Sequence, residues 1–208
     1  MNRFVLASSS PSRLSVLRSA GIEPEIIPPD TDEDAIIDRL GDAAPAEVVA
    51  ALAEAKAGDV VVPVSEDLAV VVACDSMLLL DGSLSGKPHT VDECIRRWEK
   101  QRGREARLIT GHAVRVVEGG VVKHEVTETI STTVHFGMPS DADIHAYAET
   151  GEPLGCAGAF TLEALGGWFI DGIDGDPSSV LGLSLPLIRR TLSDWGLDVS
   201  SFWNRTQK

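Results

Sequence analysis

A single aspartate lies within the longest apolar segment of the chain. Asp75 is the only charged residue from Leu68 to Leu80, a run rich in valine and leucine. Because a buried carboxylate without a partner is energetically costly, Asp75 either emerges at the end of a strand or holds a metal ion or a lysine. The alternative is an aspartate that only caps a neighbouring turn.

Two lysines and one glutamate are candidates to work with this aspartate. Lys56 is the only basic residue in 41–86, where it stands among eight acidic ones, and along its own helix only Asp59 is spaced to pair with it. Lys87 lies in a rigid turn between a glycine and a proline, and Glu33 lies in an acidic stretch. Each has a simpler interpretation. Lys56 would be a surface lysine, Lys87 a plain turn lysine, and Glu33 part of a solvated acidic loop.

The stretch from Ser8 to Arg13 is a candidate anion site. A strand end leads into three serines and then into a helix that begins at Pro11, with Ser10 as its N-cap. Free N–H groups and the positive end of the helix dipole attract anions. Arg13 is mildly unfavourable in a first helical turn unless an anion such as a phosphate lies beside it. An ordinary capped helix with a surface arginine is the alternative.

The elements that must carry these residues alternate between strand and helix, which predicts an α/β fold with a central mixed β-sheet flanked by helices. We expect strands over 3–7, 68–80, 108–117 and 121–136, a short strand over 168–170, and helices that begin near Pro11, Pro45, Thr90, Ser140 and Pro186. Each helix start combines a cap or a proline with an apolar stripe. The acidic segment 30–42 is expected to be a loop or an irregular helix.

Composition and charge exclude several classes of protein. The 208 residues are 43% hydrophobic and 24% charged, as in an ordinary globular protein. The longest apolar run has seven residues, whereas a membrane helix needs about 20, and the N-terminus does not resemble a secretory signal. The net charge of −14 argues against a protein that coats DNA. Three cysteines without a CxxC spacing suit a reducing cytosol. We therefore expect a cytoplasmic protein without membrane or nucleic-acid partners.

Several common enzyme motifs are missing from the sequence. It contains no GxxxxGK[ST] or GxGxxG loop after a strand, no HExxH and no GxSxG. Cys156 has the chemistry of a nucleophile, but no residue near it in the sequence would activate it.

Five segments carry a family resemblance: LASSSPSR, ALAEAKA, VACDSMLLLDGSLSGKP, TGEPLGCAGAF and GDPSSVLGLSLPL. In this order and spacing, from Leu6 to about Leu187, the chain resembles the Maf family of nucleoside triphosphate pyrophosphatases. The resemblance implies one domain over 1–208, built of two lobes with the active site in the cleft between them, and a homodimer. It also implies hydrolysis of a nucleoside triphosphate to the monophosphate and pyrophosphate with Mg²⁺ or Mn²⁺.

The same resemblance implies roles for individual residues. Asp75 matches the proton acceptor that activates water, and Glu33 matches an acidic residue at the metal, so Glu33 and Asp75 are the expected metal ligands. The residues that match the triphosphate contacts are Ser8, Ser10, Arg13, Lys56 and Lys87. A triphosphate carries about four negative charges and would repel a carboxylate base unless cations intervene, which agrees with these roles.

Three positions distinguish branches of the family: Ser12, Ser76 and Glu163 in this chain. The branch acting on dTTP and UTP has Arg, Thr and Gln there, and the branch acting on 7-methyl-GTP has Trp, Gln and Glu. This chain shares only Glu163, with the second branch. A glutamate accepts two hydrogen bonds from a guanine edge and favours a cationic methylated base, but the base preference stays open.

Two other functions are weighed against the pyrophosphatase. The family is also linked to arrest of cell division and septum formation, so one rival is a non-catalytic, nucleotide-sensing regulator of division. The presence of Asp75 with Lys56 and Lys87 favours the enzyme, because binding alone needs no base. The other rival is a hydrolase that uses Cys156 as its nucleophile, for which no supporting partner is visible.

Overall fold

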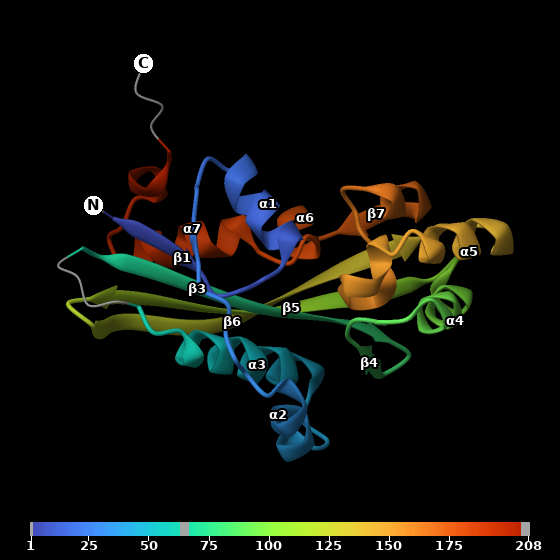
Figure 1. Ribbon diagram of the computed structural model, residues 1–208, viewed down its shortest axis with the longest axis horizontal. Helices are drawn as coiled ribbons and strands as arrows, with labels where there is room; N and C mark the ends of the chain where they lie inside the picture. The colour runs from blue at the N-terminus through green and yellow to red at the C-terminus, as the bar shows by residue number, and fades with distance from the viewer. Residues whose placement is uncertain (1, 63–66, 205–208) are drawn as a thin grey trace. The chain divides into compact units, whose positions relative to one another are not determined.

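The computed structural model describes residues 2–62 and 67–204 (Figure 1). Its strands are β1 (Arg3–Leu6), β2 (Glu25–Ile26), β3 (Ala69–Leu80), β4 (Ser83–Ser85), β5 (Glu105–Glu118), β6 (Val121–Phe136) and β7 (Ile170–Asp174). Its helices are α1 (Pro11–Ser19), α2 (Glu33–Leu40), α3 (Pro45–Asp59), α4 (Val91–Gln101), α5 (Asp141–Glu149), α6 (Pro177–Val180) and α7 (Leu185–Asp194). Short 3₁₀ helices are η1 (Glu152–Gly155), η2 (Ala157–Ala159), η3 (Leu165–Phe169) and η4 (Val199–Phe202).

The described strands form a mixed sheet. Its order is β2-β1-β3-β5-β6-β7, and β4 pairs with β3. Strand β1 is parallel to both β2 and β3, whereas the β3–β4 and β6–β7 pairs are antiparallel. The predicted α/β class with a mixed sheet is confirmed.

The described residues divide into two compact units. The first comprises those of Met1–Asp75, Gly111–Thr129 and Gly182–Lys208, and the second comprises Ser76–Thr110 and Ile130–Leu181. Strands β3, β5 and β6 continue from one unit into the other along the chain. The single two-lobed domain over 1–208 stays a prediction.

In the first unit, α3 covers one side of β1 and β3, while α1 and α7 lie on the other side (Figure 1). Successive side chains of a strand point to opposite faces, so alternate residues of β1 and β3 face α3. These residues form one core cluster with two alanines of α3: Val5, Ala7, Val71, Ala73, Ala53 and Ala57. The small alanines allow the helix to approach the sheet closely.

Gly111 of β5 shows how close this approach is. A Cβ atom added there would lie 2.2 Å from the Val49 carbonyl oxygen of α3. Real Cβ atoms do not come this near to backbone, so only glycine fits. Helix α3 is therefore fixed against the sheet at this point.

The second unit is built around Trp98 of α4, which is fully buried. Its ring makes edge-to-face contacts with Phe136, Tyr147 and Phe169, at centroid distances of 5.5 to 5.9 Å. Its indole Nε1 donates a hydrogen bond of 2.7 Å to the Ala159 carbonyl, so the only polar atom of this side chain is satisfied.

Two segments differ from the sequence prediction. The strand expected over 168–170 was wrong, because η3 occupies Leu165–Phe169 and the strand begins at Ile170. The acidic segment 30–42 contains a regular helix, α2, in which Asp32 caps the Ala35 N–H and Ile36 is buried. No helix within 2–62 and 67–204 has both the length and the apolar character that a membrane span requires.

Candidate functional site

Asp75 reaches the α3 side of the sheet through strand alternation. Val71 and Ala73 of β3 pack in the cluster with α3, and Asp75 is the next residue in the same alternation. Its side chain is 9% exposed. Of the alternatives open from the sequence, the structure gives Asp75 a lysine partner.

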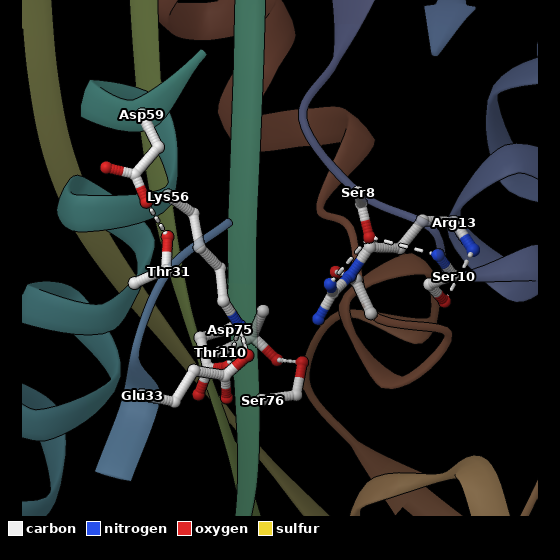
Figure 2. Close-up of polar contacts among 11 residues, drawn as sticks. Ser8, Ser10, Arg13, Thr31, Glu33, Lys56, Asp59, Asp75, Ser76 and Thr110 are labelled. Atoms are coloured by element: carbon white, nitrogen blue, oxygen red, sulfur yellow. Dashed lines mark hydrogen bonds and ion pairs between the residues drawn. The ribbon is translucent and has the colours of Figure 1, made fainter. Parts of the chain in front are cut away.

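That partner is Lys56, which belongs to the buried stripe of α3. Its spacing from Leu52 and Ala53 turns the lysine towards the sheet. Lys56 Nζ lies 2.6 Å from Asp75 Oδ1 and 2.9 Å from Glu33 Oε1 (Figure 2). One buried ammonium group therefore joins two carboxylates from different segments of the first unit.

Asp59, the one residue spaced to pair with Lys56 along α3, has another partner. It accepts a hydrogen bond from the Thr31 hydroxyl. This contact ties the segment just before Glu33 to the end of α3, and so it helps to hold Glu33 beside Lys56. Sequence reasoning missed Thr31, because a threonine in an acidic loop carries no signal of a distant partner.

Asp75 Oδ2 has different surroundings from Oδ1. It is buried, and it has no hydrogen-bond partner among the described residues. A buried acceptor in this state is unfavourable unless a ligand atom satisfies it.

No group of three or more metal-ligating side chains occurs within 2–62 and 67–204. Two carboxylates with an unsatisfied oxygen nevertheless fit Mg²⁺ or Mn²⁺, since such ions take their remaining ligands from water and phosphates.

The residues of the predicted anion site are linked by hydrogen bonds in the first unit. Ser10 caps α1, and its backbone N–H donates to Ser8 Oγ over 3.1 Å. Arg13 Nη1 also donates to Ser8 Oγ, over 3.1 Å, and Arg13 Nε donates to the Gly182 carbonyl over 2.9 Å. The guanidinium is thus held at a fixed place at the start of α1. The role of Gly182 was not anticipated from the sequence.

Cys74 lies within electrostatic reach of both groups. Burial raises the pKa of this thiol to about 11, while the charges of Arg13 and Lys56 act to lower it and that of Asp75 to raise it. The thiol is therefore neutral near pH 7.

In the view of Figure 2, β3 runs between the Lys56–Asp75 pair and the Ser8–Arg13 group.

Lys87 belongs to the second unit and is exposed. Its turn is held by the Gly86 carbonyl, which accepts from Arg97 Nη1 over 2.6 Å and from the Gly158 N–H over 3.3 Å. His89, two residues on, has a φ of 61°, which is uncommon for a residue other than glycine. Backbone strain of this kind is often found at functional turns.

The three positions predicted to distinguish branches of the family fall in different places. Ser12 is half-buried in the first turn of α1, and Ser76 Oγ shares a hydrogen bond of 3.0 Å with Thr110 Oγ1. Glu163 is exposed in the loop before η3. Glu163 and Lys87 both act on the pKa of Cys156, which is raised mainly by burial and then by the charges of Glu163 and Glu152. A raised pKa disfavours Cys156 as a nucleophile.

Comparisons with known proteins find relatives that match nearly the whole chain. A family model described as "Maf-like protein" matches residues 3–195. A Corynebacterium diphtheriae protein named nucleoside triphosphate pyrophosphatase is 62% identical over 97% of this chain and 98% of its own length. Proteins with the same name from Rhodococcus opacus and Mycolicibacterium gilvum are 56% and 53% identical, over 98% and 99% of this chain and 97% and 100% of their own lengths.

Proposed function

The chain belongs to the Maf-like family, and from this membership we propose that it is a nucleoside triphosphate pyrophosphatase. It would hydrolyse a nucleoside triphosphate to the monophosphate and pyrophosphate. The observation that supports this most is the placement of Asp75, whose Oδ1 is held by Lys56 while its buried Oδ2 lacks a partner among the described residues.

In this proposal Asp75 Oδ2 takes the proton of the attacking water. A general base must lie within hydrogen-bond reach of that water, and its orientation must be fixed. The 2.6 Å contact of Oδ1 with Lys56 Nζ fixes the carboxylate, which leaves Oδ2 for the water. Glu33, on the same ammonium group, adds the second negative charge of the site.

The positive side chains counter the charge of the substrate. Arg13, Lys56 and Lys87 would contact the triphosphate, together with the hydroxyls of Ser8 and Ser10. Glu33 and Asp75 would hold a divalent metal ion, and such an ion neutralises phosphate charge in phosphoryl transfer. Most of these residues are already held by neighbours, as Arg13 is by Ser8 and Gly182, so little reorganisation is needed on binding.

Finer parts of the function are also proposals. Ser12, Ser76 and Glu163 would select the base, with Glu163 favouring a guanine edge or a methylated, cationic base.

The family resemblance supports a cytoplasmic homodimer, and light scattering at several protein concentrations tests the dimer. The net charge of −14 supports the absence of nucleic-acid partners.

Product analysis tests the proposal. The purified chain is incubated with Mg²⁺ and a panel of ordinary and methylated nucleoside triphosphates, and the products are separated. We expect monophosphate and pyrophosphate in equal amounts. Diphosphate with orthophosphate would contradict a pyrophosphatase. Tight nucleotide binding without any product would favour the non-catalytic regulator of cell division.

A further inference from the structure

One carboxylate of the second unit holds both ends of a short loop. Glu152 begins η1 and is separated from the end of α5 by Thr150 and Gly151. Its Oε1 accepts from Thr161 Oγ1 over 2.5 Å and from the Gly166 N–H over 3.1 Å, and its Oε2 accepts from the Leu165 N–H over 3.3 Å. The Gly166 N–H also donates to Thr161 Oγ1 over 3.2 Å, so the loop from Thr161 to Gly166 is closed on the Glu152 side chain and by one bond between its own ends.

Neighbouring residues prevent this closed loop from shifting. The hydroxyl of Tyr147, a buried residue, accepts from the Thr161 N–H over 3.1 Å. A Cβ atom added at Gly166 would lie 2.4 Å from the Tyr147 hydroxyl and 2.5 Å from the Thr161 carbonyl oxygen. Both ends of the loop therefore lie against the Tyr147 hydroxyl.

Glu163 occupies the middle of this loop. Its side chain is exposed, and its Oε2 accepts from the Leu162 N–H over 3.1 Å. An exposed glutamate on an unrestrained loop would sample many rotamers and select poorly between ligands. Closure of the loop on Glu152 limits where this carboxylate can lie.

The ionisation of Glu152 agrees with this role. Burial acts to raise its pKa, but hydrogen bonds, led by those from Thr161, Gly166 and Leu165, outweigh burial, so the pKa lies below its ordinary value. The ionised carboxylate is an acceptor only and can take all three donors, whereas a neutral amide cannot.

We propose that Glu152 is a positioning residue that fixes the loop 161–166, so that Glu163 discriminates between nucleobases. The proposal rests on the proposed function, since it assigns Glu163 to base selection. It adds a residue that need not touch the substrate. The three hydrogen bonds that Glu152 accepts would hold the loop that carries Glu163.

A double-mutant cycle tests the proposal. In Glu152→Gln the amide nitrogen would face the Leu165 N–H, so at least one hydrogen bond is lost. We expect the ratio of kcat/KM between the best and the worst base to fall about five- to tenfold. Glu163→Gln should lower the same ratio, and the double variant should lower it no further than Glu163→Gln alone. Glu149→Gln, the same change on an exposed glutamate at the end of α5, should leave the ratio unchanged.

Other outcomes would overturn the proposal. A merely structural Glu152 would lower kcat/KM for all bases alike, so an unchanged ratio contradicts it, as do independent effects that multiply in the double variant. Amide hydrogen exchange at Leu165 and Gly166 reports loop opening without reference to activity, and faster exchange with an unchanged ratio also contradicts it. If Glu152→Gln does not fold, Thr161→Val removes one of the same hydrogen bonds.

Failure of the proposed function gives a different result. In that case the wild-type protein releases no pyrophosphate from any triphosphate. The same five proteins are then compared by equilibrium binding of the nucleotides, and the ratio of dissociation constants replaces that of kcat/KM. If the ratio of dissociation constants falls in Glu152→Gln, the positioning role is still supported, and an unchanged ratio rejects it.

Discussion

The two oxygens of Asp75 allow its contact with Lys56 and its proposed role as a base to be tested separately. Asp75→Asn retains an acceptor for Lys56 but removes the proposed base. We expect turnover to fall by a factor of about 100 or more, while nucleotide binding and the fold are retained. Steady-state kinetics and equilibrium binding on the same samples measure the two effects.

Asp81→Asn is the matched control for this change. Asp81 is an exposed aspartate in the turn after β3, paired with Arg104, and its φ of 51° is a conformation that asparagine adopts readily. Its kinetics should equal those of the wild type. Full activity in Asp75→Asn would remove Asp75 from the mechanism.

The lysines differ in what surrounds them, so their replacement separates phosphate contacts from surface charge. Lys56→Met and Lys87→Met should each lower kcat/KM about 10- to 100-fold, because each would remove a proposed charge-assisted hydrogen bond to phosphate. Lys100→Met, at an exposed position of α4, should change nothing measurable. Similar small effects at all three positions would reject the phosphate site. Thermal unfolding of each variant distinguishes lost contacts from a lost fold.

At the scale of elements, the sequence predicts the long helices and strands well. Ser10, Thr90 and Ser140 each cap the expected helix, because capping is a local interaction that leaves a local pattern. The two-residue strand β2 and the three-residue strand β4 were missed, since strands so short depend on their pairing partners. For the same reason, the sequence suggested a partner for Asp75 but did not identify Lys56 from the spacing alone.

Gly111 tests how closely α3 must approach the sheet. Gly111→Ala places a methyl group against the Val49 carbonyl, so α3 or β5 must shift. We expect a loss of about 1–3 kcal/mol in the free energy of unfolding, or roughly 2–4 °C in Tm per kcal/mol. Activity should fall too, because α3 carries Lys56. Differential scanning calorimetry and kinetics measure both.

Gly58→Ala is the counterpart on α3 itself. A Cβ atom there would meet only Arg115 Nη1 at 3.8 Å, which is an ordinary contact. Alanine is the better residue within a helix, so this change should raise stability by about 0.5–1 kcal/mol. If both variants destabilised equally, close packing at Gly111 would not be the cause.

His135 links three strands of the second unit in a pH-dependent way. Its Nε2 lies 2.8 Å from Asp174 Oδ2 of β7, and its Nδ1 lies 3.1 Å from Glu105 Oε1 of β5. The hydrogen bond with Asp174, first, and the charges of both carboxylates raise the pKa of His135 above 6.5.

The sign of the pH effect follows from this raised pKa. Its contribution to stability is fully present below a pH of about 6.5, and it is lost as the pH rises through the folded-state pKa. We expect the Tm of the wild type to fall over this range by more than that of His135→Gln. Parallel unfolding curves from a pH of about 5.5 to 8.5 measure the difference, and identical curves would contradict the prediction.

At the scale of the whole molecule, the net charge of −14 opposes an anionic substrate. A free triphosphate carries about four negative charges, and Glu33 and Asp75 add two more at the site. A divalent cation would halve the charge of the triphosphate and would also satisfy the two carboxylates. The protein should therefore act on the metal complex of the nucleotide and not on the free nucleotide.

Chelation tests whether this cation binds at the site or only screens the negative charge of the whole protein. Excess EDTA should reduce pyrophosphate release to background, and added Mg²⁺ or Mn²⁺ should restore it. Sodium chloride at about 1 M shortens the screening length to roughly 3 Å and so removes the field of distant charges. It should not restore activity, because a sodium ion does not replace the divalent ion that Glu33 and Asp75 would hold. If salt alone restored turnover, general charge neutralisation would suffice, and the two carboxylates would not be metal ligands.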